Sequence, residues 1–375
     1  MTVFAIRQIY PKQFENIKKA PTNYLDAAGE KHEVLKLNIK TKYLFEIENN
    51  IHEALHNNHF DGIKTYYSGK MKFRKEKYDI KFRLKGDQYD HYNSEKYSLR
   101  IKAYQDSTLK RVFSIQHPKT RNYLNEYVFH QLLKYEGLNY LDYQFLGVHI
   151  NDVFNGIYAY EEHFLNPTID DKWGKNGFIM GFNDEEFWTE GEPSERDRAY
   201  DTQRFLEAEI KTYGASEEDI SSMIKKLDMF RKGSMAADQL FDMEQMGRFY
   251  AICDLSGARH ALRWINVRYF YNKQTNKLEP VGFDSNSGKL HALMVNEDYI
   301  NPILHKQIIN SGLFKSSYNE ALNQIAKPAY LDNFFQSIEK ELIHNLRLVH
   351  KDHPVYNFNR ALWYDNQNAI KGFLK

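Results

Sequence analysis

Polar and apolar residues alternate in two short stretches of the first third of the chain, 81–85 and 96–102. A period of two is typical of antiparallel strands with one buried face, so each stretch is predicted to be a strand that gathers its cations on one side. Residues 86–93 lie between them and are rich in turn formers, which predicts a connecting loop.

Apolar residues at helical spacing predict helices elsewhere. One helix is expected over 123–136, and another after Ser216, which with Asp219 resembles a capping box. A helix over 238–253 is expected to deliver Asp254 at its end. The helix after Ser216 is expected to bury Ile220, Met223, Ile224, Leu227 and Phe230. The C-terminal part is again helical, with apolar positions at Leu331, Phe334, Phe335, Ile338, Leu342 and Leu346.

Two further hairpins are predicted from β-type runs separated by turn formers. The first joins 145–150 to 157–161 through Asn155 and Gly156, a pair that tolerates positive φ. The second places Asn266 in its first strand and Asp284 just past its second strand. Its expected parts are 264–271, the turn 272–276, and 278–283.

The order of these elements predicts the fold class. With 375 residues, 42% of them apolar, the chain can bury a substantial core. Strands dominate before Pro167 and helices after it. We therefore expect an α+β protein with a β-rich N-terminal lobe, 1–165, and a mainly helical C-terminal lobe, 166–375.

Net charge excludes partners that depend on a global electrostatic field. Lys and Arg total 51 and Asp and Glu total 50, so we expect neither nucleic acid nor an anionic membrane as a partner. Charge is nevertheless uneven along the chain. Residues 64–111 carry fourteen basic and six acidic side chains, whereas 183–219 carry thirteen acidic and four basic ones. Any partner is therefore expected to be recognised by a charged region of the chain and not by its net charge.

Cysteine content and hydropathy narrow the class further. Cys253 is the single cysteine, which excludes an intramolecular disulfide and a cysteine-based zinc site. No stretch approaches 18 apolar residues, and the N-terminal residues are too polar for a signal peptide. We expect a soluble chain without a membrane segment, and the compartment stays open.

Three polar residues form the first candidate site. Asp254, Asn266 and Asp284 follow one another at steps of twelve and eighteen residues, after a helix, in a strand and after a hairpin. Phosphoryl transfer needs a carboxylate at the attacking hydroxyl and hard oxygen ligands for Mg²⁺. Protein kinases use Asp, Asn and Asp in this order. Asp and Asn are also common in caps and turns, so the spacing alone favours ordinary loop residues.

The basic strands supply the second candidate. Lys96 lies among alternating residues and is predicted to contact phosphate as a point charge, with Lys85 assisting from the neighbouring strand. The alternative is a solvated sheet face, which is the usual setting of strand lysines.

Five segments in order resemble the CotH-type kinases, a family named for a spore-coat protein. The resemblance covers roughly residues 80 to 290 and rests on several segments together. These are Arg83-Leu84-Lys85-Gly86-Asp87, the run 96–102, the run 125–137, the run 155–164, and Asp254 with His260, Trp264-Ile265-Asn266 and Pro280-Val281-Gly282-Phe283-Asp284.

The resemblance implies a two-lobed, atypical kinase-like fold that uses ATP and Mg²⁺ or Mn²⁺ to phosphorylate Ser or Thr of a protein acceptor. It implies that Lys96 contacts phosphate and that Glu162 belongs to the nucleotide cleft between a basic and an acidic lobe. It further implies that Asp254 serves the nucleophile, whereas Asn266 and Asp284 bind the metal.

Several positions depart from the family pattern. Lys85 replaces its Arg, Asp87 replaces its Asn, and the step from Asp254 to Asn266 is long. Glu161 competes with Glu162, although the four-residue step from Tyr158 favours Glu162. The helical insert at 166–240 also diverges, which leaves the acceptor open.

Other functions remain as alternatives. A kinase-like fold can transfer AMP or glutamate, and a degenerate member can act as a scaffold without catalysis. His52-Glu53-Ala54-Leu55-His56 also fits the H-E-x-x-H pattern of zinc peptidases. The two histidines do not lie on the apolar face of Ile47, Ile51, Ala54 and Leu55, which favours exposed histidines over a buried zinc site.

Overall fold

The chain forms two compact units, each built from segments that are far apart in the sequence. Unit 1 comprises Met1–Leu124, Asp142–Glu162 and Ser337–Asn359, and unit 2 comprises Asn125–Leu141, His163–Gln336 and Arg360–Lys375. The division expected between residues 165 and 166 stays a prediction. The computed structural model describes residues 11–57, 65–86, 91–92, 96–182, 210–296 and 302–375.

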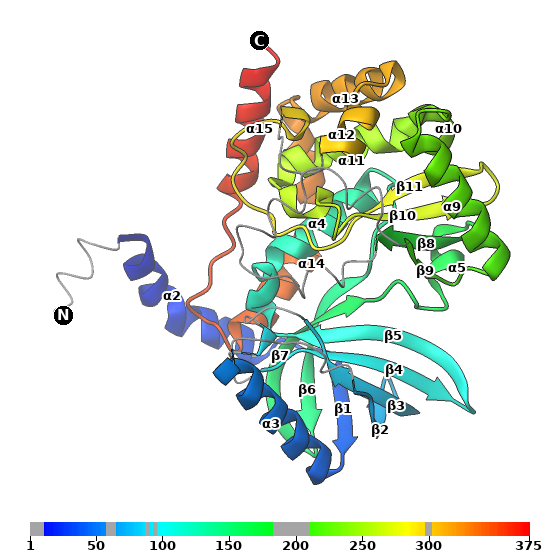
Figure 1. The fold of residues 1–375 in the computed structure, drawn as a ribbon. Coiled ribbons are helices and arrows are strands. Elements are labelled where there is room, and N and C mark those ends of the chain that lie inside the picture. Colours follow the sequence, from blue (N-terminus) through cyan, green and yellow to red (C-terminus); the bar gives the residue numbers. More distant parts are fainter. Residues whose placement is uncertain (1–10, 58–64, 87–90, 93–95, 183–209, 297–301) are drawn as a thin grey trace. The chain divides into compact units, whose positions relative to one another are not determined.

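Seven strands of unit 1 form a closed β-barrel (Figure 1). They are β1 (Val34–Ile39), β2 (Tyr67–Phe73), β3 (Glu76–Leu84), β4 (Leu99–Gln105), β5 (Thr108–Gln116), β6 (Tyr143–Ile150) and β7 (Val153–Glu162). The order around the barrel is β1-β2-β3-β4-β5-β7-β6. β1 and β6 pair in parallel and close the barrel, and the other neighbours pair antiparallel.

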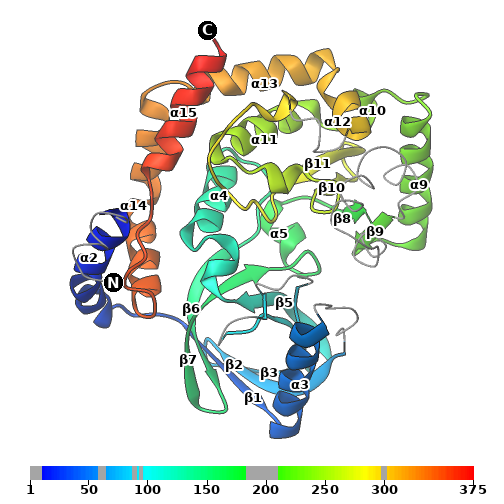
Figure 2. The ribbon, with the colours of Figure 1, turned by 60° about the vertical axis from the view of Figure 1, so that its left-hand side comes forward.

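The barrel interior is filled by every second side chain of its strands. On β3 the buried positions are Tyr78, Ile80, Phe82 and Leu84, and the residues between them face outward. The helix α3 (Thr41–Asn57) adds Ile47 and Ile51 to the same core, and Figure 2 shows it beside the strands. The strand predicted over 81–85 is therefore confirmed as the second half of β3.

The strand predicted from Lys96 begins later, at Leu99. Pairing with β3 starts at Leu84 and Leu99, because the amide of Ser98 is turned away to donate to the carbonyl of His91. Lys96 thus lies before the strand. Residues 87–90 and 93–95 of the predicted loop lie outside the described residues.

The turn of the next hairpin was predicted four residues too late. β6 and β7 are joined by Asn151 and Asp152, which both have positive φ, at 49° and 65°. Gly156 lies inside β7 with φ 91°, at the place where the register with β6 shifts. The positive φ of Gly156 allows a β-bulge in β7. The turn itself is formed by Asn151 and Asp152, which adopt the left-handed backbone.

Three helical segments complete unit 1. They are α2 (Pro11–Ala28), the 3₁₀ helix η2 (Pro118–Arg121) and the C-terminal part of α14 (Ala329–His350). Glu30, just after α2, accepts hydrogen bonds from His344 at 2.7 Å and Arg347 at 3.3 Å on α14. These contacts fasten the segment after α2 to the C-terminal residues of unit 1.

Unit 2 contains a four-stranded antiparallel sheet. Its strands are β8 (Gly177–Phe182), β9 (Ile210–Tyr213), β10 (Arg268–Asn272) and β11 (Lys277–Val281), in the order β11-β10-β8-β9. The predicted hairpin is confirmed as β10 and β11, but β10 begins at Arg268. Asn266 therefore lies in a turn before the strand and not within it. The acidic stretch is outside the described residues as far as residue 209.

Helices make up the rest of unit 2. They are α4 (Leu124–Tyr135), α5 (Ile169–Trp173), α9 (Glu217–Arg231), α10 (Ala237–Leu240), α11 (Met243–Ser256), α12 (Pro302–Ile309), α13 (Gly312–Ile325), the N-terminal part of α14, α15 (Ala361–Phe373) and the 3₁₀ helices η3 (Arg259–Leu262) and η4 (Met294–Asn296). α11 packs against α13 and α15 (Figure 2). The predicted helix 123–136 is confirmed as α4.

The helix after Ser216 is confirmed with its capping box, since the Ser216 hydroxyl accepts from the amide of Asp219 and the Asp219 carboxylate accepts in return. Its apolar face is narrower than predicted. Met223, Leu227 and Phe230 are buried, but Ile224 is 51% exposed because it lies at the edge of this stripe.

The single helix predicted over 238–253 is two helices. Asp242 separates them, because its carboxylate accepts from the amide of Gln245 and caps α11. α11 then runs to Ser256 and ends at Gly257 with φ 59°. Asp254 consequently lies inside the last turn of the helix, not after its end.

Helices and strands both contribute to the structure, so the expectation of a mixed α and β protein is confirmed. The closed barrel of unit 1 is a feature that the sequence pattern did not predict. Within the described residues, no helix is both long and apolar enough to cross a membrane.

Candidate functional site

A buried ion pair joins the end of β3 to β7 in unit 1. The ammonium group of Lys85 donates to the Glu161 carboxylate, and both residues are buried. The same ammonium donates to Oε1 of Gln116, at the end of β5, at 2.8 Å. The contact depends on long-range strand pairing, because the three residues come from three different strands or strand ends.

Two arginines add further positive charge to this pair. Arg121 Nε lies 4.0 Å from Glu161 Oε1, and Arg100 is buried on β4. Burial lowers the pKa of Lys85 to about 8; Glu161 opposes this change, whereas Arg121 and Arg100 reinforce it. Burial alone would raise the pKa of Glu161, but the three cations lower it overall. Among the described residues, three cations thus surround one carboxylate.

Two buried polar groups beside the pair have no hydrogen-bond partner among the described residues. They are Nε2 of Gln116 and the hydroxyl of Ser114. Ser114 lies directly opposite Glu161 on β7 and Arg100 on β4, so it faces the same cluster. Buried donors normally have acceptors. We call Lys85, Arg100, Ser114, Gln116, Arg121 and Glu161 the basic cluster; its charge and free donors suit an anionic ligand.

Glu162, which the sequence favoured for the nucleotide cleft, lies outside the basic cluster. It lies one residue beyond Glu161, and its carboxylate accepts from the amide of Asp142 at 3.0 Å. Successive strand residues face opposite sides, so only one of the two glutamates can join the basic cluster. The assignment of Glu162 to a nucleotide cleft, which the spacing from Tyr158 favoured, stays a prediction.

Lys96, predicted to contact phosphate, forms an ion pair within unit 1. Its ammonium donates to the Asp352 carboxylate at 2.5 Å and to the carbonyl of Ile157 at 3.0 Å, and it lies over the Tyr158 ring. Gly156 leaves room for this ion pair, because a Cβ there would lie 2.8 Å from Lys96 Nζ and overlap Asp352. Lys96 thus joins the C-terminal segment of unit 1 to β7.

Unit 2 brings Asn266 and Asp284 together through His260. His260 Nδ1 lies 3.3 Å from Asp284 Oδ1, and the amide nitrogen of Asn266 donates to the His260 carbonyl at 3.1 Å. The same amide nitrogen lies 3.1 Å and 3.2 Å from the two ring nitrogens of His260. Asn266 and Asp284 are largely buried, and the side chain of His260 is 30% exposed. We call these three residues the acidic site.

The segment after Asp284 is held in an unusual backbone conformation. Asp284 has φ 51°, in the left-handed region, and is followed by Ser285, whose amide and hydroxyl both donate to Glu126 of α4. Asn366 of α15 binds the carbonyl of Gly288 and the amide of Leu290. Two helices therefore fix the direction in which Asp284 points.

Asp254, predicted to serve the nucleophile, is fully buried. Its Oδ1 accepts from the amide of Met294 at 2.7 Å, and its Oδ2 accepts from the Tyr318 hydroxyl. The residue thus connects α11 to η4 and α13. The sequence order Asp, Asn, Asp did not reveal that the carboxylate of Asp254 accepts hydrogen bonds from Met294 and Tyr318. Asn266 and Asp284, by contrast, both contact His260.

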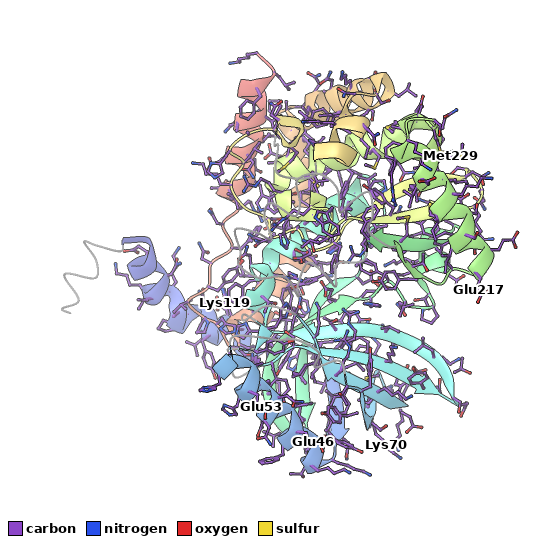
Figure 3. All side chains as sticks on the ribbon, in the orientation of Figure 1. Glu46, Glu53, Lys70, Lys119, Glu217 and Met229 are labelled. Carbon is purple, nitrogen blue, oxygen red and sulfur yellow. The ribbon has the colours of Figure 1, made fainter. Side chains whose placement is uncertain are left out.

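The zinc-peptidase pattern lies on the surface of α3. His52, Glu53 and His56 are exposed, and Figure 3 shows Glu53 on the outside of the helix. Nowhere in the described part of the chain do three His, Cys, Asp or Glu residues gather as a metal-binding group. Cys253 is buried, and burial raises the pKa of its thiol well above the ordinary value.

Comparison of the sequence with protein-family models and with curated proteins found no match in either. The site is therefore interpreted from its chemistry. The sequence pattern assigned no role to His260, Arg100 or Arg121. The order of motifs along the chain predicted the strands but carried no signal for which cations converge.

Proposed function

We propose that the chain is a CotH-like kinase that transfers the γ-phosphoryl group of ATP to a Ser or Thr hydroxyl of a protein acceptor, with a divalent metal. The basic cluster is the observation that carries this proposal. Lys85, Arg100 and Arg121 surround one carboxylate in a buried setting, and Gln116 and Ser114 add donors without acceptors. Phosphate oxygens would satisfy both the charge and the donors.

The acidic site supports the metal half of the proposal. Mg²⁺ and Mn²⁺ prefer oxygen ligands, and Asp284 offers a carboxylate and Asn266 an amide oxygen from adjacent segments. These residues fit a metal that keeps water or phosphate oxygens at its other positions. A bound divalent cation would neutralise charge on the phosphates of the nucleotide. His260 would orient both ligands through the contacts described above.

In this proposal the chain acts mainly by positioning and electrostatics. Lys85 and the two arginines would stabilise the negative charge that spreads over the phosphoryl oxygens during transfer. Glu161 would hold Lys85 in place. Asp254 would be a positioning residue, since its oxygens are bound to Met294 and Tyr318. That the chain has a two-lobed kinase-like fold, with a β-rich lobe and a mainly helical lobe, is part of the same proposal.

A second candidate is nucleotide binding without transfer, which corresponds to a scaffold. It is favoured by one observation, the burial of Asp254, because no other carboxylate has been assigned to the acceptor hydroxyl. Transfer of AMP or glutamate by the same fold is distinguished by the mass added to the acceptor.

Calorimetry of the full chain with ATP, with and without Mg²⁺, tests the proposal. Lys85→Met should abolish nucleotide binding, and Asp284→Ala should leave only weak binding that no longer responds to the metal. Asp365→Ala, an exposed carboxylate on α15, is the matched control and should bind like the unmodified chain.

Transfer is followed in the same samples by mass spectrometry of the chain after incubation with ATP and Mg²⁺. Added phosphoryl groups that disappear in Asp284→Ala support the kinase. Tight, metal-dependent binding without any modification of the chain or of a generic protein acceptor favours the scaffold. Absence of ATP binding in the unmodified chain would remove both.

A further inference from the structure

The outer surface of the barrel carries a concentration of cations that the proposed function does not use. On β1 to β4, the side chains that point out of the barrel include eight cations and a single carboxylate, Asp79. One of the eight, Arg100, is buried and belongs to the basic cluster, and the other seven do not. We call these seven cations the lysine face: Lys36, Lys70, Lys72, Lys77, Lys81, Arg83 and Lys102. Five are exposed, Arg83 and Lys102 are half-buried, and Figure 3 shows Lys70 on the outside of the barrel.

Strand register places several of these cations directly against one another. Lys36 is opposite Lys72, and Lys72 is opposite Lys77, so three lysines form a row across β1, β2 and β3. Lys81 is opposite Lys102 on β4. Opposed residues have Cβ atoms about 5 Å apart, and like charges there destabilise a sheet. Within the described part of the chain, no carboxylate forms an ion pair with any of the seven.

Solubility does not account for this arrangement. Lysines often protect a free sheet edge from pairing, but the closed barrel has no free edge at these strands. A solvated face is normally of mixed sign, as expected for a chain whose formal net charge is +1. A predominantly basic face that costs stability when empty is explained by a polyanionic partner that neutralises it.

The shape of the face and its side chains favour a flexible polyanion. The cations extend over four consecutive strands of a seven-stranded barrel, so the face is curved, and a flat bilayer would meet only a strip of it. None of the exposed large apolar side chains of the described residues lies on β1 to β4. Tyr66, 36% exposed, lies between Lys102 and Arg83, with ring distances of 4.8 Å and 5.6 Å.

We propose that the lysine face binds single-stranded nucleic acid, independently of sequence. Lysines would contact successive phosphates, and Tyr66, with Tyr104 on β4, would stack against bases. A single strand can follow the curvature across the rows of lysines. Because the field is local to this face, the near-zero net charge of the chain does not oppose binding, and the exclusion of nucleic acid drawn from net charge does not hold for this surface.

The test uses the full chain and a labelled single-stranded oligonucleotide of mixed sequence, with binding followed by fluorescence anisotropy over a range of salt concentrations. Replacing Lys36, Lys72 and Lys77 together by Gln should weaken binding at least tenfold at low salt. It should also reduce the slope of log K against log salt by about 2, since each phosphate contact in a single strand contributes roughly 0.7.

The matched control replaces three exposed lysines of other elements, Lys225, Lys315 and Lys340, by Gln. It removes the same charge and should leave affinity and slope unchanged. Circular dichroism of both triple variants confirms that each is folded. Equal losses in the two variants, or no loss in the first, would overturn the proposal. Preferential binding to vesicles of anionic phospholipid over the oligonucleotide would overturn it in favour of a membrane.

Discussion

The ammonium group of Lys85 contacts Glu161 and not the neighbouring Glu162. A step of one residue along β7 changes the side of the sheet on which a side chain lies. Glu161 is opposite Ser114 and shares its face with Arg100, whereas Glu162 is opposite Phe113, whose ring belongs to the barrel core. Strand register, set by residues far along the chain, decides which glutamate meets the cations.

The two glutamates should therefore respond differently to the same substitution. Glu161→Gln leaves Lys85, Arg100 and Arg121 buried without their carboxylate, and loss of one partner of a buried pair costs about 3 kcal/mol or more. Glu162→Gln retains an acceptor for the amide of Asp142 and should cost about 1 kcal/mol or less. Urea unfolding measures both free energies. Equal losses of unfolding free energy in the two variants would show that the ion pair of Lys85 with Glu161 stabilises the chain no more than the hydrogen bond of Glu162 does.

Nucleotide affinity should depend on pH through Lys85. Its pKa is lowered to about 8, by burial first, so about half of the free chains have lost this charge at pH 8. A bound anion favours the protonated form, and affinity for ATP should accordingly fall as pH rises through 8. Lys85→Arg keeps its charge throughout this range, and its affinity should change less. Calorimetry at pH 7 and pH 9 compares the two, and parallel declines would contradict the assignment.

Local patterns predicted the elements well where local physics decides them. The alternation in β3, the helical period of α4 and the Ser216 capping box depend on neighbours within a few residues, and all three are confirmed. The turn at Asn151 and Asp152 was missed because Asn155 and Gly156 offer an equally good local signal. Only the pairing of β6 with β7 distinguishes a turn from a bulge.

The site was less predictable, since its members meet through tertiary packing. Sequence order put Asn266 and Asp284 in one candidate site, and in the structure both contact His260. It could not show that Asp254 is bound by Tyr318, sixty-four positions further along. For the same reason Lys96 looked like a phosphate contact, although its partner is Asp352. The sequence of a motif does not show which hydrogen-bond or ion-pair partner its carboxylate or ammonium group has in the fold.

Asp254 and Tyr318 should be coupled in stability. Tyr318→Phe removes the hydroxyl that donates to Asp254 Oδ2 and leaves a buried carboxylate one donor short, which costs about 2 kcal/mol. Asp254→Asn disturbs the same contact. In a double-mutant cycle the two losses should therefore not add, with a coupling free energy of roughly 1 to 3 kcal/mol. ATP affinity should stay within about twofold in Tyr318→Phe if Asp254 only positions helices, and a large loss would return Asp254 to the binding site.

Gly156 and Gly214 offer a comparison in which backbone strain is matched and steric surroundings differ. Both have strongly positive φ, at 91° and 86°. A Cβ at Gly214 would meet no atom within 4 Å, so Gly214→Ala should cost only the left-handed strain of about 1 to 2 kcal/mol. At Gly156 the methyl group would also overlap the Asp352 carboxylate and displace it from Lys96 and from the amide of Ile157.

Gly156→Ala should therefore destabilise the chain by about 1 to 3 kcal/mol more than Gly214→Ala, the usual cost of overpacking a closed site. Adding Asp352→Ala to Gly156→Ala removes the carboxylate that the methyl group overlaps. If the overlap is the cause, the steric part of the loss should largely disappear in the double variant, leaving the strain and the loss of the ion pair. Urea unfolding of the unmodified chain, Gly156→Ala, Gly214→Ala and the double variant resolves these contributions. Equal losses at the two glycines would mean that β7 shifts to accept the methyl group, and that the ion pair of Lys96 with Asp352 does not depend on glycine at this position.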